Sequence, residues 1–180
     1  IMGGTCARAC PVETLCEGVC VRNQGDDRPV TIGLLQRFAV DEALQEGTGF
    51  FSRSEQTGKS VGVVGAGPAG FSCAHRLAVL GHDVVVYEAR AKSGGLNEYG
   101  LAAYKMLDGF AQKEAEFITS LGGIEIVHDT ILGRDVTVQE LQKRHDAVFL
   151  GIGLGGGNSL GIPGEESEGV ADAVAFIDGL

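Results

Sequence analysis

Basic residues are scarce in this 180-residue sequence, which has 14 lysines and arginines against 24 acidic residues and a net charge of −10. Binding to nucleic acid needs a basic face for the phosphates, so the composition argues against such a partner. The sequence also lacks a run of 18 apolar residues, which excludes a transmembrane helix. Its first residues lack the basic and apolar regions of a secretory signal. We therefore expect a cytoplasmic protein with no nucleic-acid partner and no membrane partner.

A glycine-rich segment at 61–70, VGVVGAGPAG, ends an apolar run and contains the motif Gly65-x-Gly67-x-x-Gly70. An alanine-rich stretch follows, and then a second apolar run ends in Glu88. In such an arrangement the first glycine permits a tight turn, the second lets a pyrophosphate approach, and the third lets a helix pack on the strand. The acid can accept hydrogen bonds from a ribose diol and would repel a 2′-phosphate. The segment therefore predicts a site for FAD or NAD rather than NADP, and the alternative is a Rossmann-like unit that binds nothing.

The chain from residue 60 onward alternates between strand and helix patterns. We expect strands at 60–64, 83–88, 124–127 and 146–151, and helices at 68–80, 109–121 and 137–143. Asp108 and Thr137 are the expected N-caps of the last two helices. On the first helix the residues expected to face the sheet are Ala69, Ala74, Leu77, Ala78 and Leu80. The pattern predicts an α/β fold of the Rossmann-like, three-layer kind.

The chain divides into three zones. Residues 1–46 carry four of the five cysteines, polar residues 47–59 are typical of a linker, and residues 60–180 carry the α/β pattern. A second glycine-rich fingerprint that opens a helix is missing, because the glycines at 155–157 are followed by Pro163 rather than by a helix pattern. We therefore expect this chain to be part of a larger protein.

The cysteines of the first zone form the block Cys6-x3-Cys10-Pro11-x4-Cys16-x3-Cys20. Thiolates spaced this densely suit iron–sulfur clusters, which take four cysteines each. Zinc is an alternative, although zinc sites favour two separated cysteine pairs. Free buried cysteines in a small helical segment are the other alternative. In a reducing compartment a metal or redox role is favoured over disulfides.

Four segments then point to a family. They are CARACPVETLCEGVC, PVTIGLLQRF, KSVGVVGAGPAGFSCAHRLAVLGHDVVVYE and GGLNEYGLAAYK, in this order. Together they resemble the NAD(P)H-oxidising flavoprotein module of dihydropyrimidine dehydrogenase, which is shared with the small chain of bacterial glutamate synthase. The resemblance spans essentially the whole chain. It implies that residues 1–46 are the C-terminal part of a helical domain for two [4Fe–4S] clusters, and that residues 60–180 are the first part of an FAD-binding domain.

The resemblance also implies metal ligands. Cys10 and Cys16 resemble ligands of one cluster and Cys20 resembles a ligand of the other, whereas Cys6 matches a cysteine that is not a ligand. Gln36 falls where the pyrimidine-reducing branch completes the first cluster with a glutamine and glutamate synthase small chains typically have a glutamate. Without the resemblance it would be an ordinary helix-surface glutamine. Three cysteines and one glutamine are too few for two clusters, so we expect this chain alone to bind no intact cluster.

For the flavin, the resemblance implies contacts made largely by backbone. The residues implied are Gly65, Ala66, Gly67, Pro68 and Ala69 at the pyrophosphate, Glu88 at the ribose, Gly95, Leu96 and Gly151 on the flavin side, and Lys105 where the pyrimidine enzyme has an arginine. No residue is expected to be a proton-transfer catalyst.

The implied function is that of an electron-entry module. Electrons from NAD(P)H would pass through FAD and the clusters to a catalytic domain or subunit that reduces uracil or thymine. One alternative is the glutamate synthase small chain, whose partner synthesises glutamate, and another is a non-catalytic docking or assembly module. We expect the isolated chain to be inactive. We also expect it to self-associate through an exposed sheet edge and core surface.

Overall fold

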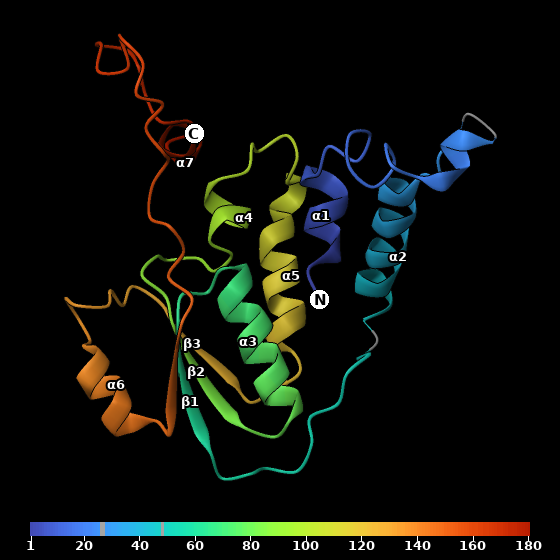
Figure 1. Ribbon diagram of the computed structural model, residues 1–180. Coiled ribbons are helices and arrows are strands. Elements are labelled where there is room, and N and C mark those ends of the chain that lie inside the picture. The colour runs from blue at the N-terminus through green and yellow to red at the C-terminus, as the bar shows by residue number, and fades with distance from the viewer. Residues whose placement is uncertain (26–27, 48) are drawn as a thin grey trace.

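The computed structural model describes residues 1–180 apart from 26–27 and 48, and its centre is a parallel four-stranded sheet with strand order β3-β2-β1-β4 (Figure 1). The strands are β1 (Ser60–Val64), β2 (Asp83–Tyr87), β3 (Ile124–Val127) and β4 (Ala147–Leu150). β1 pairs with β2 and β4, and β2 pairs with β3. The predicted strands are confirmed, with β2 and β4 slightly shorter than expected.

Helices cover both faces of the sheet. α3 (Pro68–Val79) and α5 (Phe110–Thr119) lie on one face, where Phe71 and Ile118 pack with Val63 and Val86. α6 (Val138–Arg144) lies on the other face, where Leu141 packs with Val64 and Tyr87. Successive residues of a strand point to opposite faces, so Val63 and Val64 enter different cores. This arrangement confirms the three-layer α/β architecture (Figure 1).

Two helix-boundary predictions had different outcomes. Thr137 caps α6 as predicted, in a capping box with Glu140. Asp108 was wrongly predicted as the N-cap of α5. It lies in the 3-10 turn η2 (Leu107–Gly109), with φ of +58°, and Gly109 is the N-cap with φ of +64°. Two successive left-handed residues reverse the chain before α5 begins, so the Asp108 side chain makes no capping hydrogen bond.

The buried face of α3 also differs from the prediction. Phe71, Ala74, His75 and Ala78 are buried, at the i, i+3, i+4, i+7 spacing of one helix face. Ala69 and Leu80 are exposed, contrary to the expectation that they face the sheet. His75 belongs to this buried face as well. It is buried because the ring of Phe51, from the segment before β1, lies edge-on to it at 4.6 Å between centroids.

The N-terminal part of the chain is helical and lies beside α5, away from the sheet (Figure 1). It contains α1 (Gly3–Ala9), the 3-10 helix η1 (Val21–Gln24) and α2 (Ile32–Glu46). α1 packs between α2 and α5. Two short helices complete the chain, α4 (Leu96–Tyr99) and α7 (Ala173–Asp178), and they contact each other. In the part of the chain that the structure describes, no helix is long and apolar enough to span a bilayer.

Candidate functional site

The turn between β1 and α3 owes its shape to two glycines. Gly65 has φ of +97°, and a Cβ there would overlap the carbonyl oxygen of Gly151. A Cβ on Gly70 would overlap the carbonyl oxygen of Gly65. With glycines at these two positions, α3 and β1 approach each other more closely than a residue with a side chain would allow. Gly67 is different, because a Cβ there would meet only the Cα of Gly95, at an ordinary 3.7 Å. The contacts of the protein itself therefore do not require a glycine at 67, and in the fingerprint this glycine is the one that lets a pyrophosphate approach the backbone.

Glu88 follows β2 directly and is only 7% exposed. One carboxylate oxygen accepts the backbone N–H of Ala66 at 2.7 Å, and the other accepts the backbone N–H of Arg90 at 2.9 Å. The acid is thus fixed against the glycine-rich turn, where the fingerprint predicts it. Its hydrogen bond to the turn was not anticipated from the sequence.

Two further loops converge on this turn. The N–H of Gly94 donates to the carbonyl of Ala66 at 2.8 Å, and Gly95 lies against Gly67. Gly151 donates its N–H to the carbonyl of Val64 at 2.8 Å, beside the fingerprint glycines. The structure therefore gathers the turn residues 65–69 with Glu88, Gly95 and Gly151, and the neighbouring Leu96 side chain is 61% exposed. Such a glycine-lined edge at the carboxyl ends of parallel strands fits the pyrophosphate and ribose of a dinucleotide.

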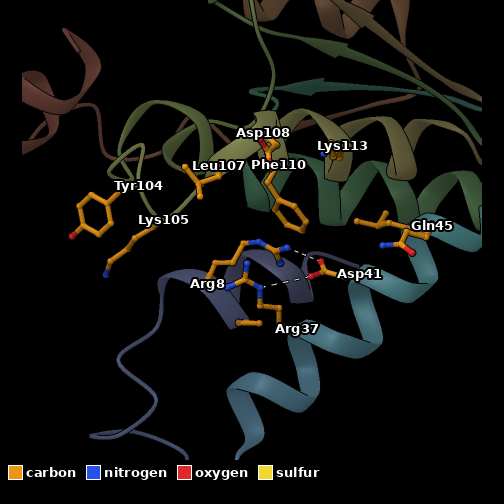
Figure 2. A pocket seen from close by; sticks show the side chains of 12 residues that line it. Arg8, Arg37, Asp41, Gln45, Tyr104, Lys105, Leu107, Asp108, Phe110 and Lys113 are labelled. Carbon is orange, nitrogen blue, oxygen red and sulfur yellow. Dashed lines mark hydrogen bonds and ion pairs between the residues drawn. The ribbon is translucent and has the colours of Figure 1, made fainter.

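Lys105 does not lie at the glycine-rich turn but beside α1. Its ammonium donates to the carbonyl of Ala9, at the end of α1, over 3.5 Å. It lines a cleft of about 610 Å³ between α1, α2 and the 104–113 segment. Figure 2 shows Arg8, Arg37 and Tyr104 in the same cleft.

The cysteines of the N-terminal block follow one another around α1 and the loop after it. Cys6 is in α1 and Cys10 is its C-cap, and both thiols are exposed, as is Cys16. Burial and the neighbouring Cys10 raise the pKa of Cys6. The backbone N–H of Val30 lowers the pKa of Cys20. Among the residues that the structure describes, no three cysteine, histidine or acidic side chains gather as a metal site. The predicted cluster ligands are thus close together in the sequence, but their side chains do not converge on one point in the described structure.

Gln36 lies on α2, and its side-chain amide is directed at α1. A Cβ on Gly3 would lie 3.2 Å from its Nε2. Thiols of the kind that ligate iron–sulfur clusters are thus present in this part of the chain, and among the described residues no three of them gather at one point.

Sequence reasoning missed Glu114, which is 3% exposed on α5. It accepts the backbone N–H groups of Gly4 at 3.0 Å and Thr5 at 3.1 Å, and also the Thr5 hydroxyl. The signal was present, since position 114 falls within the apolar stripe of its helix, between Ala111 and Ala115.

Sequence reasoning also did not anticipate the contacts of His145, which is the C-cap residue of α6. Its ring is half-buried over Gly62, with Nδ1 2.6 Å from the Ser60 hydroxyl and Nε2 3.0 Å from the Tyr87 hydroxyl. Burial lowers the pKa of His145, helped by Arg144 and opposed by Asp146. This cluster joins β1, β2 and the end of α6.

Comparison with known proteins gives two family matches. Residues 1–48 match the family of dihydropyrimidine dehydrogenase domain II, 4Fe-4S cluster. Residues 63–99 match the NAD(P)-binding Rossmann-like domain family. The two matches cover the cysteine-bearing helices and the fingerprint with its acid.

Curated relatives match nearly all of the chain. The glutamate synthase [NADPH] small chain of Escherichia coli K12 is 38% identical over 96% of this chain and 36% of its own length. The NAD-dependent dihydropyrimidine dehydrogenase subunit PreT of the same organism is 34% identical over 98% of this chain and 42% of its own length. This chain thus spans less than half the length of these relatives.

Among solved structures, FprA from Mycobacterium tuberculosis in complex with NADPH is similar over 67% of this chain and 28% of its own. The TM-score is 0.56 and the identity is 26%.

Proposed function

We propose that this chain is the electron-entry module of an NAD(P)H-dependent oxidoreductase. The proposal rests on the iron–sulfur segment and the dinucleotide-binding unit, which the chain shares with dihydropyrimidine dehydrogenase subunits and glutamate synthase small chains. The observation that carries the proposal is the coexistence, in one chain, of the 4Fe-4S family match and a glycine-rich turn closed by Glu88. In this proposal residues 1–46 belong to the cluster domain, 47–59 to a linker and 60–180 to the flavin domain.

The residues of the glycine-rich edge would hold FAD. Backbone N–H groups of the turn 65–69, at the start of α3, would face the pyrophosphate. Glu88 would accept the hydroxyls of the adenosine ribose, and Gly95, Leu96 and Gly151 would border the flavin side. FAD, when bound, accepts a hydride from NAD(P)H and releases its electrons singly to clusters, which cannot take a hydride.

The cysteine block would supply part of two [4Fe–4S] sites. Cys10, Cys16 and Gln36 would bind one cluster and Cys20 the other, with the remaining ligands outside this chain. Free thiols of this kind suit the reducing cytoplasm. Lys105, beside the carbonyl of Ala9, would place a positive charge between the flavin domain and the cluster segment.

For the terminal acceptor we favour a pyrimidine, reduced by a partner domain or subunit. The support is Gln36, which matches the pyrimidine-reducing branch. A glutamate-synthesising partner is the second candidate, supported by the 38% identity to the glutamate synthase small chain.

The test is to purify the full-length protein with its partner anaerobically and to measure its flavin and iron content. Oxidation of NADPH and NADH is then followed with uracil or thymine, or with 2-oxoglutarate plus glutamine. Activity with a pyrimidine supports the favoured acceptor, and activity with 2-oxoglutarate plus glutamine selects the second candidate. A full-length protein without flavin would overturn the electron-entry function and leave a docking or assembly module.

A further inference from the structure

Helix α1, which carries Cys6 and has Cys10 as its C-cap, has no N-terminal cap of its own. Its N-cap residue Met2 makes no side-chain capping hydrogen bond, and its first turn holds no acidic residue. The N–H groups of Gly4 and Thr5 donate instead to one oxygen of Glu114, 110 and 109 positions along the chain. The first N–H groups of a helix need partners from outside the helix. Here the α/β part of the chain provides them.

The Thr5 side chain extends this connection toward the predicted flavin site. Its hydroxyl bonds to the second oxygen of Glu114 and accepts the side-chain amide of Asn97 at 3.4 Å. Asn97 is in α4, two positions after Gly95. Thr5 is 7% exposed and Glu114 is 3% exposed. A continuous chain of hydrogen bonds, buried at Glu114 and part-buried at Asn97, therefore runs from α4 through Thr5 to α5.

Packing leaves α1 little freedom on either side. A Cβ on Gly4 would overlap the ring of Phe110, so α1 and α5 approach as closely as a glycine permits. The Arg8 guanidinium lies 3.5 Å from the centroid of the same ring and pairs with Asp41 of α2 at 2.6 Å (Figure 2). Arg8 thus connects α1 with both of its neighbouring helices.

We propose that Gly4, Thr5, Asn97 and Glu114, here called the α1 seat, fix the cysteine-bearing helix against the flavin domain and so set the geometry of electron transfer between them. This inference rests on the proposed function. Cys6 follows Thr5 directly, and Cys10, the first predicted cluster ligand, lies one helical turn farther on. Glu114 is a positioning residue, since it acts through α1. A small displacement of reacting groups is enough to slow a reaction strongly.

The test compares Glu114→Gln with Glu116→Gln, an exposed glutamate two positions away on the same helix, in the flavin- and cluster-loaded holoprotein. Rapid mixing with NAD(P)H under anaerobic conditions separates flavin reduction from the later passage of electrons to the clusters. For Glu114→Gln we expect flavin reduction within about twofold of wild type and cluster reduction slower by about tenfold or more, because the amide cannot accept all three hydrogen bonds. Glu116→Gln should leave both phases unchanged. Unchanged cluster reduction in Glu114→Gln, or an equal loss of both phases, would overturn the proposal.

Hydrogen exchange gives a readout that does not depend on turnover. The amides of Gly4 and Thr5 should exchange about tenfold faster in Glu114→Gln and at the wild-type rate in Glu116→Gln. Unchanged exchange of these two amides in Glu114→Gln would contradict the proposal that Glu114 holds α1 in place. A wild-type protein without cofactors would overturn the proposed function, and the exchange experiment would still decide whether Glu114 holds α1.

A second pair of variants guards against misfolding of Glu114→Gln. Thr5→Val removes the hydroxyl and keeps the backbone hydrogen bonds, and Thr5→Ser keeps both. Slower cluster reduction in Thr5→Val, restored in Thr5→Ser, supports the proposal, and equal rates in the two variants count against it.

Discussion

The Glu88 carboxylate accepts the backbone N–H of Ala66 at 2.7 Å, which ties the acid at the end of β2 to the turn at the end of β1. The second oxygen accepts the N–H of Arg90 at 2.9 Å, so the whole group is held in one orientation. A carboxylate offers about four acceptor positions, so two stay available for the hydroxyls of a ribose. Glu88 therefore holds the turn in place, and its remaining acceptor positions allow the contact with the ribose that the proposed function requires.

Replacing Glu88 with glutamine should weaken FAD binding by about tenfold or more, because a charged acceptor becomes a neutral amide with one oxygen. Titration of the apoprotein with FAD, followed by flavin fluorescence, measures the effect. The matched control is Glu125→Gln, at an exposed position on β3. Equal FAD affinity of Glu88→Gln and wild type would show that the acid has only a structural role.

Gly70→Ala should lower the free energy of unfolding by about 1–3 kcal/mol or more, because the added methyl overlaps the carbonyl oxygen of Gly65. Urea denaturation followed by circular dichroism measures the loss. Gly156→Ala is the control, since a Cβ there meets nothing within 4 Å. Similar midpoints for the two variants would mean that α3 can move away from β1 at little cost.

Cys10→Ser in the full-length protein should remove one cluster, whereas Cys6→Ser should keep both. The two thiols are one helical turn apart and both are exposed, so the two substitutions should disturb the local structure equally. A difference in iron content between the variants then reports on cluster ligation. Iron and acid-labile sulfide per protein are measured after anaerobic purification. Loss of iron in Cys6→Ser, or full iron content in Cys10→Ser, would reverse the assignment.

The protein should lose stability as the pH falls from about 7.5 to 5, because burial lowers the pKa values of both His75 and His145. Below about pH 6.5 the histidines of the unfolded chain bind protons that those of the folded chain do not. The free energy of unfolding therefore keeps falling with pH until the pH is below the pKa values of the folded protein. Carboxylates with lowered pKa values, such as Asp146, contribute at lower pH, where they begin to protonate. Urea midpoints across this range measure the profile, which should be shallower in His145→Gln. Parallel profiles of the two proteins would contradict the prediction.

The isolated 180-residue chain should self-associate through β4, an edge strand of the sheet. Apolar side chains near this edge are exposed, with Leu150 at 50% and Ile152 at 63%. An exposed apolar edge is a template for pairing with a second chain. Leu150→Lys should shift the protein toward monomer in sedimentation velocity at high concentration. A wild-type chain that stays monomeric there would exclude this edge as an interface.

Local patterns were sufficient to predict much of this molecule. Apolar runs marked the strands, the glycine-rich motif marked the turn at Gly65, and Thr137 with Glu140 marked the start of α6. Each of these signals acts over a few residues, through backbone conformation or an adjacent side chain. The prediction at Asp108 was wrong for a related reason. Aspartate is a residue type that favours the N-cap position, but the left-handed backbone at Asp108 prevents its side chain from capping α5.

By itself the sequence determined the α/β class, the dinucleotide fingerprint and the cysteine block, because these depend on spacing along the chain. Only the tertiary structure decided that Glu114 receives the N–H groups of Gly4 and Thr5, and that His145 lies between Ser60 and Tyr87. These contacts join residues 58 to 110 positions apart. Their existence depends on which faces of the helices and strands meet, and packing of the whole chain fixes that choice.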